Sequence, residues 1–125
     1  MTKILLSEDH EELWDSLSRR LRRRNFEVVL AHDGQQTLDQ VAAERPDIVL
    51  LDLNLPVMDG WTVAQTLREA GNRVPIIALT AHAMAADRAR ALAAGCDEFH
   101  AKPVTFDELL RQIDEMLLRA EEDGG

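Results

Sequence analysis

Short apolar runs alternate with amphipathic stretches along the whole of this 125-residue chain. The apolar runs are rich in Ile, Val and Leu without strict polar alternation, which is typical of strands buried on both faces. They lie near residues 3–7, 26–31, 47–52, 75–80 and 98–102. The stretches between them repeat apolar residues at helical spacing and lie at residues 11–24, 34–44, 61–69, 84–94 and 106–119. This order predicts an α/β fold, a (βα)5 chain with a parallel sheet, right-handed crossovers and helices on both faces.

Local signals mark where several of these elements begin or end. Gly95 follows the alanine-rich stretch 84–94 and suits the C′ position of a helix, because glycine adopts the left-handed conformation at little cost. Thr105 and Glu108 have the spacing of a capping box at the start of the last helix. The four prolines fall at element edges, where a missing N–H is tolerated, at positions 46, 56, 75 and 103.

The acidic composition narrows the classes of partner and location. The net charge is -9 and the pI about 4.8, which argues against direct binding to nucleic acid or to an anionic membrane. No segment approaches the ~20 apolar residues that cross a bilayer, and the N-terminus lacks an apolar core of signal-peptide length. The single Cys96 cannot form an internal disulfide and is expected to be a small buried side chain. We therefore expect a cytoplasmic domain without membrane insertion.

One domain accounts for nearly all of the chain. The length suits a single core, and no repeat, linker or low-complexity tract interrupts residues 1–120. Residues 121–125 are acidic and end in glycine. We expect them to form a frayed acidic tail or the stub of a linker.

Polar side chains follow four of the predicted strands. Glu8 and Asp9 follow the first strand, and Asp52 ends the third. Thr80 ends the fourth strand, and Lys102 follows the fifth. In open parallel sheets, ligands bind beyond the carboxyl ends of the strands, where the strand order reverses. We therefore expect these side chains to share one site.

Three carboxylates in one pocket need a compensating charge. Two unit charges ~4 Å apart repel by about 4 kcal/mol at an effective dielectric of 20, so Glu8, Asp9 and Asp52 require a proton, a lysine or a metal ion. Lys102 supplies one cation, and several oxygens at an open cleft suit Mg²⁺. Asp52 could also attack a phosphoryl group to form an acyl phosphate, with Mg²⁺, Lys102 and Thr80 each meeting one of its oxygens.

Four motifs stand at these strand ends. They are the acidic pair at 8–9, Leu-Asp-Leu-Asn-Leu-Pro-Val-Met-Asp-Gly at 51–60, Leu-Thr-Ala-His-Ala-Met at 79–84 and Lys-Pro at 102–103. Their order and approximate spacing resemble those of the CheY-like receiver domains of two-component response regulators, over nearly the whole chain. The resemblance implies a flavodoxin-like, doubly wound sheet of five parallel strands in the order 2-1-3-4-5.

The resemblance also implies a role for each residue of the phosphoryl site. Asp52 matches the phosphoacceptor, Lys102 the phosphate-pairing lysine and Thr80 the switch hydroxyl. Phe99 matches the aromatic residue whose rotamer reports activation. The bond between Lys102 and Pro103 matches a peptide bond that is usually cis in this family.

The same resemblance implies a magnesium site and a position that sets the phosphate lifetime. The implied direct ligands are Asp9, Asp52 and the backbone carbonyl of Asn54. Glu8 stands where Asp is common and would act through water. His82, with Asn54, lies where the family varies the side chains that tune hydrolysis.

The implied donor is a phosphohistidine on a histidine kinase or a histidine phosphotransfer domain. The chain would be a phosphoacceptor switch in a phosphorelay rather than an enzyme, catalysing only its own phosphorylation and dephosphorylation. The phosphoryl group would draw Thr80 towards it, Phe99 would fill the vacated space, and the surface of the fourth helix, fifth strand and fifth helix would change. The Leu-Thr-Ala-His-Ala-Met segment looks similar to the receivers of hybrid kinases and to single-domain relay regulators. The sequence does not identify the downstream protein effector.

Three other readings compete with this one. Phosphatases of the haloacid dehalogenase type also use a strand-end Asp and Mg²⁺, but they usually carry a second acid where this chain has Asn54. A flavin-binding protein of similar topology would need a Ser/Thr/Gly-rich loop after the first strand, where this chain has Glu8 and Asp9. A pseudo-receiver would keep the fold and act as a binding module without phosphorylation.

Overall fold

The computed structural model describes residues 1–81 and 84–124, within which parallel strands alternate with helices. The strands are β1 (Lys3–Ser7), β2 (Glu27–Ala31), β3 (Ile48–Asp52), β4 (Ile76–Thr80) and β5 (Glu98–Ala101). The helices are α1 (Glu11–Arg23), α2 (Gly34–Glu44), α3 (Gly60–Glu69), α4 (Ala85–Ala94) and α5 (Phe106–Gly124). The sheet order is β2-β1-β3-β4-β5, which confirms the predicted topology.

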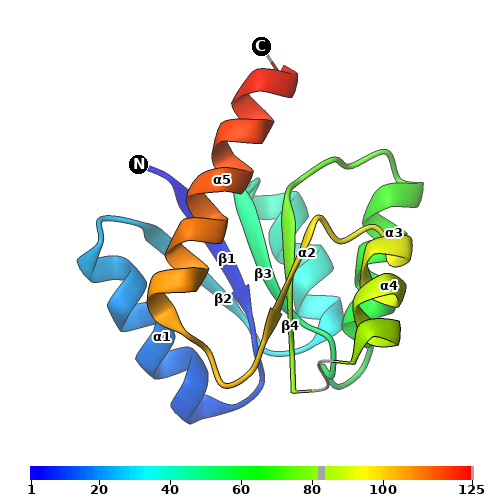
Figure 1. Ribbon diagram of the computed structural model, residues 1–125, viewed down its shortest axis with the longest axis horizontal. Coiled ribbons are helices and arrows are strands. Elements are labelled where there is room, and N and C mark those ends of the chain that lie inside the picture. Colours follow the sequence, from blue (N-terminus) through cyan, green and yellow to red (C-terminus); the bar gives the residue numbers. More distant parts are fainter. Residues whose placement is uncertain (82–83, 125) are drawn as a thin grey trace.

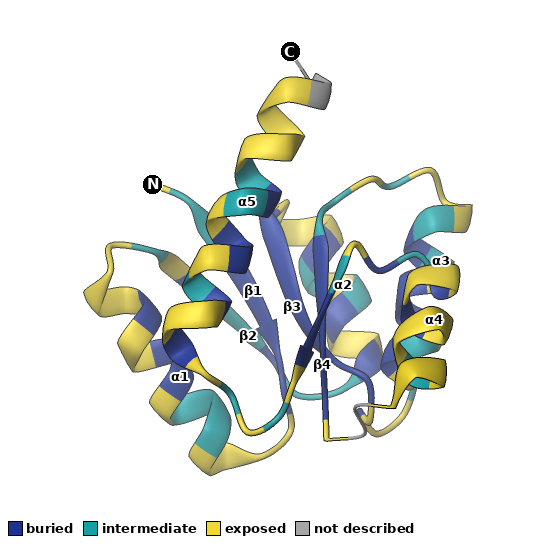
Figure 2. Ribbon diagram, in the orientation of Figure 1, coloured by how far each residue is buried: buried dark blue, intermediate teal, exposed yellow. Residues whose placement is uncertain are grey.

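The sheet separates two apolar cores (Figure 1). Helices α2, α3 and α4 pack on one face, and α1 and α5 pack on the other. Along β3, Val49 and Leu51 enter the first core while Ile48 and Leu50 enter the second. Both faces of the central strands are therefore buried (Figure 2), which explains why the sequence of these strands does not alternate with polar residues.

The last helix extends further than its apolar stripe predicts. Helix α5 continues to Gly124, so residues 121–124, expected as a frayed tail or a linker stub, are helical. Glutamate is a good helix former, and no proline or glycine interrupts the helix before Gly124. Within residues 1–81 and 84–124, no helix combines the length and the apolar character needed to span a membrane.

The start of α5 also differs from the predicted capping box. The Thr105 carbonyl accepts the Leu109 N–H at 2.9 Å, so Thr105 does precede the first turn. The N–H of Thr105, however, donates to His100 Nε2 at 3.1 Å instead of to Glu108. The Glu108 carboxylate lies 3.7 Å from the Arg111 guanidinium. A buried imidazole thus takes the place expected for the carboxylate.

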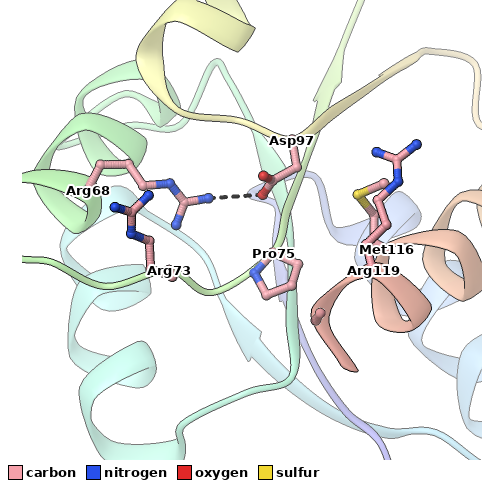
Figure 3. A pocket seen from close by; sticks show the side chains of 7 residues that line it. Arg68, Arg73, Pro75, Asp97, Met116 and Arg119 are labelled. Carbon is pink, nitrogen blue, oxygen red and sulfur yellow. Dashed lines mark hydrogen bonds and ion pairs between the residues drawn. The ribbon is translucent and has the colours of Figure 1, made fainter. Parts of the chain in front are cut away.

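At the amino edge of the sheet, the Arg68 side chain forms hydrogen bonds to the loop after α3 and to the loop between α4 and β5. Its Nε donates to the Gly95 carbonyl, its Nη1 to the Asn72 carbonyl and its Nη2 to Asp97, each at 2.9 Å. Asp97 also accepts the Ile76 N–H at 2.8 Å. Figure 3 shows the Arg68–Asp97 contact in a cavity of about 630 Å³ that is further lined by Arg73, Pro75, Met116, Arg119 and Ala120. This cavity contains none of the predicted site residues.

Cys96 is buried, as predicted, beside this cluster. Gly95, which precedes it, has a φ of 112° and ends α4 as expected for a C′ glycine. Burial raises the pKa of the Cys96 thiol to about 12, and the negative charge of Asp97 adds to this effect while Arg68 opposes it. The thiol of the folded protein is therefore a small apolar group at neutral pH.

We expect native Cys96 to react slowly with a thiol reagent at about pH 9, and to react rapidly once urea unfolds the chain. The folded thiol keeps its proton up to about pH 12, whereas the unfolded thiol releases it near 9.0. The stability linked to this group is thus present below pH 9.0 and declines as the pH rises towards 12. Urea unfolding of wild type and Cys96→Ala across this range measures the difference. A stability gap that does not change with pH would contradict the expectation.

Candidate functional site

Four neighbouring strands bring the predicted polar residues to one edge of the sheet. Strands β1, β3, β4 and β5 are consecutive. Their carboxyl ends are in register through the pairs Ser7–Leu51, Asp52–Leu79 and Thr80–Ala101. Glu8 follows β1 directly, and Lys102 follows β5 directly. The order of the strands therefore places both next to Asp52 and Thr80.

The Lys102 ammonium joins two buried acids. Its Nζ lies 2.6 Å from Glu8 Oε1 and 3.5 Å from Asp52 Oδ2. Glu8 is 0% exposed and Asp52 is 3% exposed, so both carboxylates are removed from water. The backbone N–H of Lys102 donates to the Thr80 carbonyl at 2.7 Å, which fixes the root of the lysine side chain. Lys102 is thus a shared counter-ion, and it lies closer to Glu8 than to the predicted phosphoacceptor.

Burial and charge set the protonation of this pair. Burial raises the pKa of the Glu8 carboxyl; the hydrogen bond from Lys102 opposes this rise, and the negative charge of Asp52 adds to it. Burial alone would lower the pKa of Lys102, but the hydrogen bond to Glu8 and the attraction of Asp52 outweigh it, so the pKa is raised. Lys102 therefore stays charged at neutral pH, and its charge makes an ionised Glu8 tolerable inside the protein.

The backbone around Asp52 is crowded and fixes the carboxylate. Asp52 Oδ1 accepts the Asn54 N–H at 3.0 Å. The Gly60 N–H donates to the Leu53 carbonyl at 3.1 Å. A β-carbon on Gly60 would lie 2.5 Å from the Asp52 carbonyl oxygen, so only glycine lets α3 begin this close to the strand. The role of the Asn54 carbonyl as a metal ligand stays a prediction.

Glu8, Asp9 and His10 form a cluster that could hold a cation. One ligand atom from each lies within 4.8 Å of the others, with Glu8 buried and Asp9 and His10 exposed. Glu8 Oε2 also accepts the His10 N–H at 3.1 Å. Hard carboxylate oxygens at an open edge are the donors that Mg²⁺ prefers. The residues present therefore fit the predicted ion.

His10 stands at the N-cap position of α1 and extends the site. Its side chain makes no capping bond at the start of this helix. Its Nδ1 instead lies 3.9 Å from Glu8 Oε2. Lys102 links Asp52 to Glu8 of this cluster. The place of Asp52 in the metal ligand set stays a prediction.

The residues predicted to act in the switch lie on β4 and β5. Thr80 ends β4 and is 2% exposed. Phe99 is buried in the core under α2, α3 and α4. The Lys102–Pro103 peptide bond is cis, as predicted. His82 lies outside the described residues.

His32 supports the acidic pair, although no sequence pattern marked this residue. His32 follows β2, where no reactive residue was predicted. Its Nδ1 lies 3.1 Å from the Glu8 carbonyl oxygen, which can only accept, so Nδ1 carries the proton. The ring of His32 also packs on Trp14, with centroids 4.8 Å apart. A lone histidine after a strand carries little sequence signal, because its partner comes from another strand.

Comparison with known proteins identifies the family. A model of the response regulator receiver domain matches residues 4–114, and the chain belongs to this family. The response regulator MprA of Mycolicibacterium vanbaalenii is 38% identical over 123 residues, which cover 98% of this chain and 53% of that protein. MprA of Mycobacterium tuberculosis is 38% identical over 117 residues, covering 94% and 51%. The chain thus spans about half the length of the curated relatives it matches.

Solved structures agree with the fold and the class. The receiver domain of the sensor histidine kinase PA1611 from Pseudomonas aeruginosa is 38% identical, has a TM-score of 0.84 and covers 93% of this chain and 97% of its own. That structure is described with a magnesium ion coordinated in the active site cleft. A CheY-like receiver from Methanospirillum hungatei is 27% identical, with a TM-score of 0.91 and 98% coverage of each chain. The chain is thus a signal-transduction module of the two-component type.

We expect Lys102→Met to destabilise the protein by about 3–5 kcal/mol at pH 7, because it leaves the buried Glu8 charge without a partner. The raised pKa of Glu8 means that the folded state takes up a proton more readily than the unfolded state. The deficit should therefore shrink as the pH falls through the raised pKa of Glu8, and grow as the pH rises.

The control for this prediction is the double variant Glu8→Gln/Lys102→Met, which removes the Glu8 charge together with its cation and leaves only Asp52 without Lys102. It should recover much of the lost stability, and its difference from wild type should depend less on pH than that of Lys102→Met. Urea unfolding between about pH 5 and pH 8 provides the measurement. A Lys102→Met deficit that is the same at every pH would show that Glu8 is not the group left unpaired.

Proposed function

We propose that this receiver domain accepts a phosphoryl group on Asp52 from a phosphohistidine. The observation that carries the proposal is the Lys102 ammonium, which lies 3.5 Å from Asp52 Oδ2 at the carboxyl edge of the sheet. A carboxylate oxygen of Asp52 attacks phosphorus, a P–O bond forms as the P–N bond breaks, and the imidazole nitrogen keeps the electron pair. Lys102 pairs with one phosphoryl oxygen and the Thr80 hydroxyl donates to another.

A magnesium ion completes the proposed site. Asp9, Asp52 and the Asn54 carbonyl would hold it, with Glu8 contributing through water. When bound, Mg²⁺ neutralises the charge on the oxygens of the transferred group. The exposed Asp9 and the open edge of the sheet support this assignment, as does the magnesium in the cleft of the PA1611 receiver.

The proposed donor is a histidine kinase or a histidine phosphotransfer domain, and the proposed location is the cytoplasm. A reducing compartment suits a chain whose single thiol is buried and unpaired. The domain would promote its own phosphorylation and dephosphorylation and otherwise act as a switch. Asn54 and His82 would tune the lifetime of the acyl phosphate.

We expect acetyl phosphate with Mg²⁺ to add one phosphoryl group to wild type and none to Asp52→Asn. Intact-mass measurement detects the adduct, and borohydride trapping followed by peptide mapping locates it. Asp39→Asn changes an exposed aspartate on α2 and is the matched control, which should be modified like wild type. Chelation of the metal should suppress the reaction. An unmodified wild-type protein, or an adduct on another residue, would refute the proposal and favour a receiver that acts without phosphorylation.

The proposed switch surface includes a weakly anchored helix. Helix α4 buries only Ala91 and Ala94, while Met84 and Leu92 are exposed. Such small side chains bury little apolar area, so α4 gains little stability from the core. The Arg90 guanidinium, 4.2 Å from the Trp61 ring centroid, adds one contact to α3. In contrast, α5 buries Phe106, Leu109, Ile113 and Met116.

We expect amide exchange in residues 84–94 to be fast relative to the first turns of α5, and to change on phosphorylation or on binding beryllofluoride. Hydrogen exchange measured by mass spectrometry on wild type and Asp52→Asn, each with and without the phosphoryl donor, tests this. Helix α1, which buries Leu17 and Leu21, is the internal reference. Equal exchange in α4 before and after activation would remove α4 from the switch.

A further inference from the structure

His100 is a buried polar residue with no part in the proposed phosphoryl chemistry. It is 3% exposed, and both ring nitrogens have partners. Nε2 lies 3.1 Å from the Thr105 backbone N, and Nδ1 lies 2.9 Å from Gln112 Oε1. A backbone N–H can only donate, so Nε2 must accept and Nδ1 must carry the proton. The contacts are therefore compatible with a single form of the ring, the neutral Nδ1–H tautomer.

The chain of hydrogen bonds continues from His100 to the predicted switch residue. Gln112, on α5, is 5% exposed, and its Nε2 donates to the Phe99 carbonyl at 3.2 Å. The bonds run in one direction, from Thr105 through His100 and Gln112 to Phe99, and each donor meets an acceptor. Hydrogen bonds in a buried series of this kind polarise one another. Strand β5 and helix α5 are thus joined through side chains as well as by the connecting loop.

The same bonds enclose the segment that carries Lys102. Residues 102–105 form the loop between β5 and α5, and the bond from the Thr105 N–H to His100 Nε2 ties the end of this loop to β5. Within it, the Lys102 N–H donates to the Thr80 carbonyl at 2.7 Å. These two anchors fix the backbone on both sides of Lys102. The position of its ammonium group relative to Asp52 therefore depends on His100.

We propose that His100 is a positioning residue with two separable effects. Its Nε2 holds the loop that presents Lys102 to the phosphoryl group. Its Nδ1–H, through Gln112, links the Phe99 segment to α5, so that a movement of Phe99 alters α5. The inference rests on the proposed phosphorylation of Asp52 and identifies the side chains that carry its effect to α5.

Two conservative substitutions separate these effects. In His100→Gln the side-chain oxygen can reach the place of Nε2 and accept the Thr105 N–H, but the donor to Gln112 is lost. In His100→Asn the side-chain nitrogen can take the place of Nδ1 and donate to Gln112, but Thr105 loses its acceptor. Gln112→Leu removes the link to Phe99 and leaves the loop closed.

We expect His100→Asn to be phosphorylated by acetyl phosphate about threefold to tenfold more slowly than wild type, and His100→Gln to stay within about twofold, since one hydrogen bond separates them. The amide exchange of α5 shows the reverse pattern. Its change on phosphorylation should persist in His100→Asn and disappear in His100→Gln and Gln112→Leu. A purely structural role would change both measurements together.

The control is Ser18→Ala, which removes the hydrogen bond from the hydroxyl of the buried Ser18 to the Asp15 carbonyl (3.1 Å) on α1 and should alter neither measurement. Histidine ¹⁵N NMR on wild type reads the tautomer directly and requires no variant to fold. An Nε2–H tautomer, or equal effects of both His100 substitutions on both measurements, would overturn the proposal. A wild type that acetyl phosphate does not modify would refute the proposed function, while the NMR result would still test the geometry of His100.

Discussion

The contact between Glu8 and Lys102 is the interaction on which the site depends. A carboxylate with 0% exposure cannot stay ionised without a close cation, and Lys102 supplies it at 2.6 Å from a residue 94 positions away in the chain. Two strands, β3 and β4, lie between β1 and β5 in the sheet. The lysine side chain must therefore reach across the ends of both, which brings it to Asp52. The need to neutralise one buried acid thus holds a cation next to a second acid.

The helices on the two faces of the sheet differ in how much apolar surface they bury near the carboxyl edge that carries the site. Helices α1 and α5 contribute large apolar side chains to their core, whereas α4 contributes two alanines to the other. A change in charge at Asp52 meets little resistance on the α4 side. On the α5 side, hydrogen bonds between buried groups join β5 to the helix. The two sides of the sheet thus differ in how firmly their last helices are attached.

Much of the site could be predicted because strand ends converge in any open parallel sheet. Asp52, Thr80 and Lys102 stood out as polar residues at the ends of apolar runs, and strand order brought them together. The histidines could not be assigned in this way. His32 and His100 act through partners on other elements, and neither partner follows from periodicity or spacing. The roles of both follow from tertiary contacts alone.

The different cap at the start of α5 has the same origin. The capping box matched by spacing, yet the imidazole of His100 competes for the Thr105 N–H and takes it. Helix α5 itself continues past the end of its apolar stripe to Gly124, because glutamates need no core contact to remain helical. Local patterns thus predicted where elements occur better than they predicted which groups satisfy their ends.

Strand β5 has a neighbouring strand on one side only. An exposed strand edge is normally a template on which another chain can add a strand. Here the Phe99 N–H donates to the Glu98 carboxylate at 3.0 Å, and the Phe99 carbonyl accepts from Gln112. Both backbone groups in the middle of this short strand are already satisfied by side chains of the protein itself. Addition of a strand from another chain is therefore disfavoured at the free edge of β5. A partner protein that binds here would have to contact side chains of the flanking helices instead.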